Sequence, residues 1–392
     1  MADVSMPKDF GFGSDEEMLR DLARKLLREE MPIEKLRRLV AADPKTVYDD
    51  GQRPGWDEAL WKQCVELGWT GLAVPEEAGG VGISLVGIAA LLEEVGRAAL
   101  PSPLVATLNA TFALRAAGSA EANRCLGRIA DGATASLAIT DETGSWDPRR
   151  TDVRMLGDRE SVTITGRAYF VQDAFKADLF IVHARAANGH SLCVVPADAP
   201  GVDIVQDHIH DLTRDQATVH FNEVAIPAEQ IVSKDAVAAL RGAWPAILVS
   251  VSADLCGSSE WQLQTTVEYA KTRKQFDRPI GFFQAVKHPL SNAMIQIDRA
   301  RSLLYHAACC VDHGSDDAER AARMAKSAAS DAGKFVSDRS VQLHGGIGFT
   351  WECDVHLYFK RSMHNQALYG DGVHQRRKLA ETIIGPIESG EV

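Results

Sequence analysis

The stretch Gln342–Gly372, QLHGGIGFTWECDVHLYFKRSMHNQALYGDG, combines glycines, aromatic residues and ionisable residues at both of its ends. It opens on a turn with Gly345, Gly346 and Gly348, where positive φ angles and a close approach of backbone amides to a ligand such as a phosphate are allowed. It closes on Tyr369–Gly372, in which one carboxylate lies between two glycines. Gly-Asp-Gly is equally ordinary chemistry for a tight turn between helices. Both ends are therefore candidate ligand contacts, with a plain helix connection as the alternative.

Length and composition limit the classes of protein that fit this chain. Its 392 residues exceed one ordinary core and predict two or three domains. A net charge of -12 and a pI near 5.5 argue against nucleic acid as a partner. The seven scattered cysteines lack a CxxC spacing and are interpreted as buried thiols of a reducing compartment, without a metal site. Because the N-terminus has no apolar signal core and no stretch reaches about 18 apolar residues, we expect a cytoplasmic protein outside the membrane.

The first third of the chain has helical patterns. Ser14 and Glu17 have the spacing of a capping box at the start of a helix. The Gly-rich segment at residues 79–82 would suit a phosphate, but no strand precedes it, so we interpret it as a helix connection. The further predicted helices cover residues 56–68, 84–97 and 103–130, the last with a break at Gly118. We expect an all-helical N-terminal domain over residues 1–134.

The middle of the chain consists of short β-prone runs separated by Gly, Pro, Asp and Asn. This spacing predicts a small antiparallel domain, a barrel or a sandwich, over residues 135–233. The turn Thr140–Ser145 offers hydroxyls and backbone amides without bulk, although an ordinary loop explains it as well. The predicted strands lie at residues 135–140, 161–166, 168–171, 177–183, 191–195 and 217–221.

The remainder, residues 234–392, is predicted to be a helical bundle. One long helix over residues 236–272 is apolar on all sides in its first half, as expected of an element buried on several sides, and Pro245 is a candidate kink. Arg273–Gly281 forms an irregular connection. The other predicted helices begin at residue 284 and cover residues 316–343, 355–368 and 373–384. The expected fold is mainly α, with a central β domain between two helical domains.

Several motifs, in order along almost the whole chain, resemble the acyl-CoA dehydrogenase family of flavoproteins. The strongest is YAKTRKQFDRPIGFFQ at Tyr269–Gln284. Separate matches are WTGLAVPEEAGGVG at Trp69–Gly82, DLTRDQATVHFNEVAIP at Asp211–Pro227, QLHGGIGFTWE at Gln342–Glu352, and Lys360-Arg361. The resemblance implies an acyl-CoA substrate, FAD as cofactor and an electron-transfer flavoprotein as electron acceptor.

The implied FAD contacts have suitable chemistry. A guanidinium suits a pyrophosphate, aromatic rings suit flat surfaces, amides suit polar edges, and glycines allow backbone approach. In the family, the contacts of the C-terminal domain reach the FAD of a neighbouring subunit, which implies an oligomer. These contacts are Arg273, Phe276, Phe283, Gln284, Gln342, Gly345 and Gly346. In the β domain the implied contacts are Thr140, Ser145, Phe170 and Gln172, although the family usually has Trp and Thr where this chain has Phe170 and Gln172.

The reaction of the family needs a carboxylate base at the α carbon of the thioester. In the usual pattern this base is a Glu directly after the Tyr of the closing turn, but here that position is Gly370, and Asp371 follows. The family's second location for the Glu falls near Ile247, where Trp244–Ser252 contains no acid, and Glu260 is too far along the helix. We therefore expect Asp371 to be the base.

Two other functions remain open. In the first, the chain is the FAD-contact subunit of a heteromeric acyl-CoA dehydrogenase, and a paralogous partner supplies the Glu. In the other, it is a flavin oxidase of the same fold, similar to nitroalkane oxidase, in which an Asp base belongs to the family's repertoire. Tyr369–Gly372 and the string FQAVKH at Phe283–His288 resemble the bacterial branch that acts on bulky, often steroid-derived acyl-CoA thioesters.

Overall fold

The computed structural model describes residues 7–43, 45–48, 55–157 and 161–385. The chain forms two compact units. The first consists of Met1–Arg37, Leu85–Leu100 and Leu248–Val392, and the second of Arg38–Ser84 and Pro101–Ile247. The domain boundaries near residues 134 and 233 mark changes in secondary structure, and they stay a prediction.

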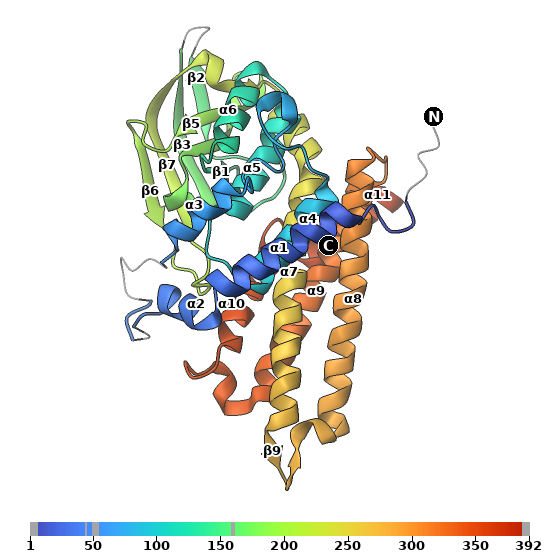
Figure 1. Ribbon diagram of the computed structural model, residues 1–392. Coiled ribbons are helices and arrows are strands. Elements are labelled where there is room, and N and C mark those ends of the chain that lie inside the picture. Colours follow the sequence, from blue (N-terminus) through green and yellow to red (C-terminus); the bar gives the residue numbers. More distant parts are fainter. Residues whose placement is uncertain (1–6, 44, 49–54, 158–160, 386–392) are drawn as a thin grey trace, which may run out of the picture. The chain divides into compact units, whose positions relative to one another are not determined.

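The first unit is a helical bundle around α9, whose many small alanines allow close packing against α8, α10 and α11. Figure 1 shows the second half of α7 beside α8 and α9, with the hairpin β9–β10 at the end of α7. This arrangement confirms the expected bundle. Its elements are α1 (Ser14–Glu30), α4 (Leu85–Arg97), the second half of α7 (Ala236–Thr272), β9 (Lys274–Gln275), β10 (Arg278–Pro279), α8 (Gln284–Asp312), α9 (Ala318–His344), α10 (Val355–Ala367) and α11 (Gly372–Ile384).

Two glycines allow α4 and α7 to cross with their backbones in contact. A Cβ on Gly257 would lie 1.8 Å from the Glu93 carbonyl oxygen, and one on Gly96 would lie 2.2 Å from the Asp254 carbonyl oxygen. No side chain fits at either position without separating the two helices. Glu93, beside this crossing, is buried and accepts hydrogen bonds from Arg301 Nε (2.8 Å) and the Tyr305 hydroxyl (2.6 Å) of α8.

The predicted capping box at the start of α1 is wrong by one residue. The N-cap is Gly13, and its backbone N–H donates to Glu16 Oε2 at 3.0 Å. Because the helix already includes Ser14 as its first residue, neither Ser14 nor Glu17 has the position that the box requires.

The second unit contains a mixed sheet covered by helices. The strand order is β6-β7-β3-β2-β4-β5-β8, with β1 also pairing with β4. Pairing is antiparallel except that β1 and, over a single residue pair, β2 run parallel to β4. Its elements are α3 (Glu58–Glu66), α5 (Leu104–Ala117), α6 (Ala120–Ala130), β1 (Ala135–Ala138), β2 (Arg154–Gly157), β3 (Ser161–Gln172), β4 (Leu179–Ala186), β5 (Gly189–Pro196), β6 (Val202–Gln206), β7 (Gln216–Pro227) and β8 (Ile231–Ser233), while α2 (Ile33–Val40) belongs to both units.

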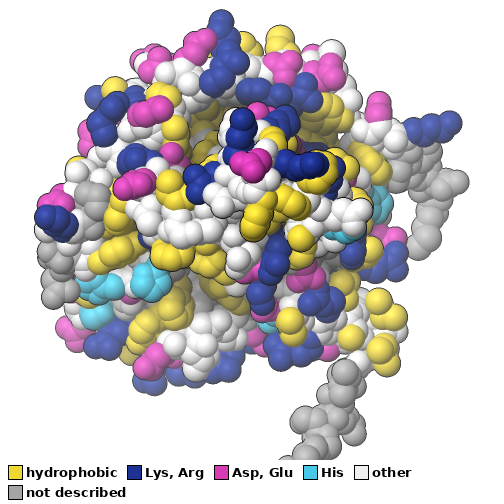
Figure 2. Space-filling view, turned by 90° about the horizontal axis from the view of Figure 1, so that it is seen from below, with side chains coloured by type: hydrophobic (Ala, Val, Ile, Leu, Met, Phe, Trp, Pro, Cys, Tyr) yellow, Lys and Arg dark blue, Asp and Glu magenta, His cyan; other side chains and the backbone are white. Residues whose placement is uncertain are grey.

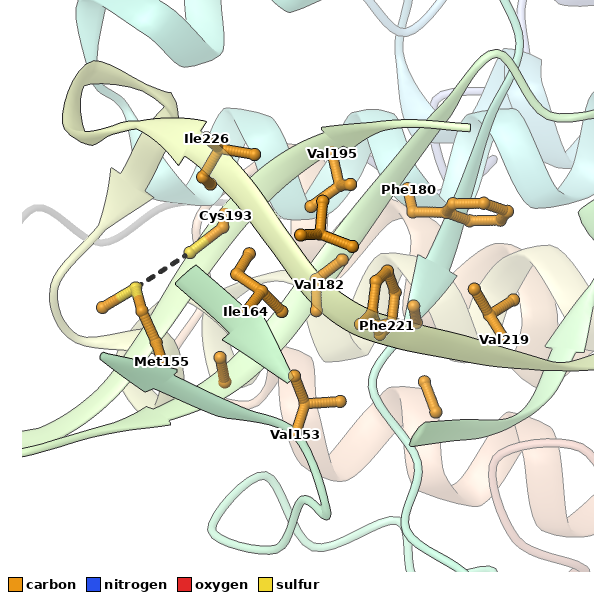
Figure 3. Close-up of a cluster of buried hydrophobic side chains, with 14 of the residues drawn as sticks. Val153, Met155, Ile164, Phe180, Val182, Cys193, Val195, Val219, Phe221 and Ile226 are labelled. Carbon is orange, nitrogen blue, oxygen red and sulfur yellow. Dashed lines mark hydrogen bonds between the residues drawn. The ribbon is translucent and has the colours of Figure 1, made fainter. Parts of the chain in front are cut away.

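The core of this sheet is apolar. Figure 3 shows Phe180 and Val182 of β4 facing Phe221 of β7, and Met155 of β2 facing Cys193 of β5. The Cys193 thiol lies 3.5 Å from the Met155 sulfur, and burial raises its pKa to about 12, so it behaves as an inert apolar group. The fold class expected from the sequence, helical domains with a central antiparallel-rich β domain, is confirmed.

The surface is mixed in character, and the most apolar long helix is mostly buried. On the face shown in Figure 2, basic, acidic and apolar side chains are interspersed, and no continuous basic stripe crosses it. Among the described residues, α7 is the helix long and apolar enough to cross a membrane, and 72% of its most apolar window is buried inside the structure.

Candidate active site

The turn that closes Gln342–Gly372 leads from α10 into α11 with a strained backbone. Tyr369 has φ of +56° and Gly370 has φ of +92°, both in the left-handed region. Asp371 is the N-cap of α11, and its Oδ1 accepts a hydrogen bond from the His374 backbone N–H at 2.8 Å. Its other oxygen, Oδ2, makes no hydrogen bond with any residue that the structure describes. One oxygen of the carboxylate is thus held by the helix, and the other is available.

No side chain fits at Gly370, the position of the family's Glu. A Cβ there would lie 2.3 Å from Cδ2 of the His374 ring and 3.0 Å from Gln375 Nε2. Burial, followed by the nearby Arg377, lowers the pKa of His374, so the ring that fills this space is neutral at neutral pH. Both the backbone angle and the space therefore exclude the usual base.

The turn is fixed by hydrogen bonds to its carbonyl oxygens. Gln375 Nε2 donates to the Tyr369 carbonyl at 2.7 Å and to the Gly370 carbonyl at 3.2 Å. Arg323 Nη1 of α9 donates to Gln375 Oε1 at 2.9 Å and orients this amide. Such bonds offset the cost of the two positive φ angles, about 1–3 kcal/mol for a residue such as Tyr369.

The acidic residues of α7 nearest to the family's second location for a base are both engaged by the fold. Asp254 was missed in the sequence and is buried, where it accepts from Arg361 Nε at 2.9 Å and Asn365 Nδ2 at 2.8 Å. Arg361 and Asp254 have no exposed side-chain surface. Glu260 pairs with Arg301 at 3.1 Å. Both carboxylates therefore belong to structural ion pairs.

The predicted FAD contacts of the C-terminal part lie at one end of the bundle. The Tyr269 ring stacks on the His344 ring with 4.3 Å between centroids, which joins the last turns of α7 and α9. Phe276, at the tip of the hairpin, is 86% exposed and meets the Phe283 ring edge-on at 6.1 Å. The other members of this cluster are Arg273, Gln284, Gln342, Gly345 and Gly346, all exposed.

This cluster has the open backbone and exposed groups that FAD needs. Gly345 has φ of +66°, and a Cβ on Gly345 or Gly346 would meet nothing within 4 Å. Exposed aromatic rings and a guanidinium belong to the same cluster, so the residues present fit a dinucleotide.

The cluster and the closing turn are far apart within one chain. Lys326, which contacts the closing turn, and His344, which contacts the cluster, belong to the same helix. At about 1.5 Å rise per residue they are about 27 Å apart along its axis. The structure therefore does not bring these two sets of predicted residues into one site of a single chain.

The predicted contacts of the β domain lie together in the second unit. Tyr169 N donates to the Thr140 carbonyl at 3.0 Å, which joins the loop after β1 to β3. Phe170 has φ of +57° and is 37% exposed, and its ring lies over Gly144, where a Cβ would be 3.4 Å from Cε2. Ser145 N donates to Asp141 Oδ1 at 3.0 Å.

Gln172 has a supporting position in this group. Its side chain is buried, and Nε2 donates to the Phe170 carbonyl at 3.0 Å and to Gln216 Oε1 at 2.8 Å. The amide thus supports the unusual backbone of Phe170 from inside the domain. Ser145 and Phe170 are at least partly exposed, whereas Thr140 is buried like Gln172.

The chain is similar to known proteins over almost its whole length. The N-terminal, middle and C-terminal domains of acyl-CoA dehydrogenase match residues 13–133, 136–224 and 249–384. The acyl-CoA dehydrogenase IpdE2 of Mycobacterium tuberculosis is 31% identical over 89% of this chain and 91% of its own length. Among solved structures, a single-residue variant of the Tcur3481-Tcur3483 steroid ACAD is 28% identical, with a TM-score of 0.84 over 95% of this chain and 98% of that one. The ChsE4-ChsE5 complex from M. tuberculosis is 27% identical, with a TM-score of 0.86 over 97% of this chain and 100% of that one.

Proposed function

The chain belongs to the acyl-CoA dehydrogenase family, whose cofactor is FAD, and we propose that it dehydrogenates a bulky acyl-CoA thioester with Asp371 as the base. The observation that carries this proposal is the position of Asp371. It is the carboxylate of the closing turn, one residue after the family's usual base, and its Oδ2 is not used by the fold in the described residues. A carboxylate with an available oxygen is what removal of the α proton requires.

FAD, when bound, accepts the hydride from the β carbon. We propose that Arg273, Phe276 and the open turn at Gly345 and Gly346 hold the FAD of a neighbouring subunit. The distance along α9 supports this assignment, because His344, beside the open turn, is about 27 Å along the helix axis from Lys326, which contacts this chain's own closing turn. Phe170 and its neighbours at the edge of the β domain would cover the flavin ring of this chain.

The proposed substrate class is a steroid-derived or other bulky acyl-CoA thioester. It is supported by the 28% identity to a protein described as a steroid ACAD. We propose an electron-transfer flavoprotein as the acceptor that reoxidises FAD.

A second candidate function is that of a subunit in a heteromeric enzyme, in which a paralogue supplies the base. Two observations favour it. The position of the family's Glu is closed by the His374 ring. The two solved structures described above each name two proteins, Tcur3481-Tcur3483 and ChsE4-ChsE5.

Expression of the chain alone and together with a paralogue tests both functions. FAD content and dye-linked activity are measured with butyryl-CoA, octanoyl-CoA, isobutyryl-CoA and CoA thioesters of steroid side-chain acids. Activity of the chain alone supports Asp371 as base, and activity that requires the paralogue favours the second function. Oxygen consumption with a nitroalkane and no response to CoA esters would instead indicate a flavin oxidase.

Two variants of Asp371 separate its chemistry from its role as a cap. Asp371→Asn keeps a good N-cap and removes the base, so FAD content and melting temperature should stay while turnover falls at least about 10²-fold. Asp371→Ala should lose the same activity and also about 1 kcal/mol of stability. If Asp371→Asn retains near-normal turnover in the active assembly, Asp371 is not the base.

A further inference from the structure

One face of α9 is polar although the helix lies inside the bundle. Arg323, Lys326, Ser327 and Ser330 recur at helical spacing and face the closing turn. Ser327 Oγ donates to the Gly372 carbonyl at 3.2 Å, and Arg323 orients the amide of Gln375. The carbonyl oxygens on both sides of Asp371 thus receive hydrogen bonds from this face.

Lys326 is the central residue of that face. Its side chain is fully buried, and Nζ donates to the Gly370 carbonyl at 3.1 Å, the Gln366 carbonyl at 2.9 Å and the Ser330 hydroxyl at 2.9 Å. All three partners are neutral. A buried ammonium group without a carboxylate in its hydrogen-bond set is costly for stability.

The charge of the Asp371 carboxylate acts on Lys326. Burial lowers the pKa of Lys326 to about 7, and the Asp371 carboxylate acts in the opposite direction, so the two groups are electrostatically coupled. A lysine buried at this cost, with Nζ bonded to the residue before the proposed base, is a candidate for a role in the site.

We propose that Lys326 is a positioning residue for proton abstraction: it holds the Gly370 carbonyl, and with it the strained turn, so that the Asp371 carboxylate points at the α carbon of the thioester. This inference rests on the proposed function of Asp371. A positioning error of about 1 Å at a reacting group can lower the rate by about 10²-fold. Loss of the Nζ hydrogen bonds would leave the Gly370 carbonyl with its bond from Gln375 and so hold the turn less firmly at its positive φ angles.

The test compares two variants of the FAD-loaded enzyme in its active assembly. Lys326→Met keeps the length of the side chain and removes all three donors. Ser330→Ala is the matched control, because it removes one partner of Lys326 but leaves the contact with Gly370. The readouts are kcat and KM per bound FAD and the α-deuterium isotope effect, measured with the panel thioester of highest rate and its α-deuterated form.

We expect Lys326→Met to lower kcat per FAD at least about 10-fold, leave KM within about threefold, and raise the isotope effect, because cleavage of the α C–H bond becomes slower. Ser330→Ala should resemble the wild type. Lys326→Gln, which keeps one side-chain donor, should give an intermediate loss and replaces the Met variant if that variant does not fold.

Wild-type kcat per FAD and isotope effect in both Lys326 variants would overturn the inference. So would a loss of kcat with an unchanged isotope effect, since that marks a purely structural role. The Asp371→Asn variant distinguishes the two levels: if it is inactive while the Lys326 variants are normal, only the role of Lys326 fails. If Asp371→Asn is active, the proposed base itself fails.

Discussion

Replacing Asp254 by asparagine removes one charge from an ion pair that has no exposed surface. Arg361 then keeps its charge in the core, with an amide in place of the carboxylate that it contacts through Nε and Nη2. At about 4 Å and an effective dielectric constant of about 20, the lost attraction is about 4 kcal/mol. Breaking a buried pair from one side costs about 3–5 kcal/mol in other proteins, so we expect a loss of that size.

The assay is urea unfolding of the wild type and the variant, followed by circular dichroism at one protein concentration and one FAD concentration. Asp331→Asn is the matched control, because Asp331 pairs with Arg376 on the surface, where both side chains are about half exposed. It should change the free energy of unfolding by less than about 1 kcal/mol. The double variant Asp254→Leu with Arg361→Met should be less destabilised than Asp254→Asn, because it leaves no unpaired charge. A loss below about 1 kcal/mol in Asp254→Asn, equal to the control, would refute the reasoning.

The remaining predictions concern one titration, one helix crossing and one exposed ring. Between pH 7 and 10.5 the unfolded chain still binds a proton at Lys326 that the folded protein has released. The free energy of unfolding of the wild type should therefore rise with pH in this window, by up to about 1.4 kcal/mol per pH unit relative to Lys326→Met. If the free energies of unfolding of the two proteins change in parallel from about pH 7 to 9, this prediction is wrong. Gly257→Ala should lower the stability by more than about 3 kcal/mol or prevent folding, because its Cβ would overlap the Glu93 carbonyl. The control Gly68→Asn, with positive φ and open space around it, should be tolerated. Solubility and melting temperature of both variants test this prediction. Phe276→Ala should leave the melting temperature of FAD-free protein unchanged, since the ring is 86% exposed, but should weaken FAD retention on gel filtration, and normal retention would remove Phe276 from the cofactor site.

The spacing of apolar residues predicted most elements well, because each of these elements buries enough side chains to show a regular spacing in the sequence. The long helix α7 is apolar on all sides in its first half, and α5 and α6 are separated at Gly118 as expected. The predicted strands at 161–166 and 168–171 form one strand, β3, since its bulges hide the continuity of its pairing with β7. Strands β2 and β6 were missed because they bury few side chains and exist through hydrogen bonds to β3 and β7.

The candidate site was predictable as far as its motifs reach. The motifs indicated Arg273, Phe276, Gly345 and Gly346 as one set of contacts, which the structure places at one end of the bundle, and they indicated Asp371 in the closing turn. They did not indicate Asp254, whose role depends on Arg361 more than 100 residues away, or Lys326, which lies in an Ala-rich helix without a motif of its own. Long-range polar contacts of this kind leave no local periodicity.

The amino-acid sequence by itself determined the family, the class of fold and the absence of a Glu after Tyr369, because these depend on residue identity and order. Only the tertiary structure decided that the His374 ring fills the space at Gly370 and that Oδ1 of Asp371 caps α11. It also decided that Lys326 of α9 donates a hydrogen bond to the Gly370 carbonyl of the same turn. The physical reason is that a turn between two helices gets its shape from the side chains packed under it, and here those come from α9, about 40 residues earlier in the chain.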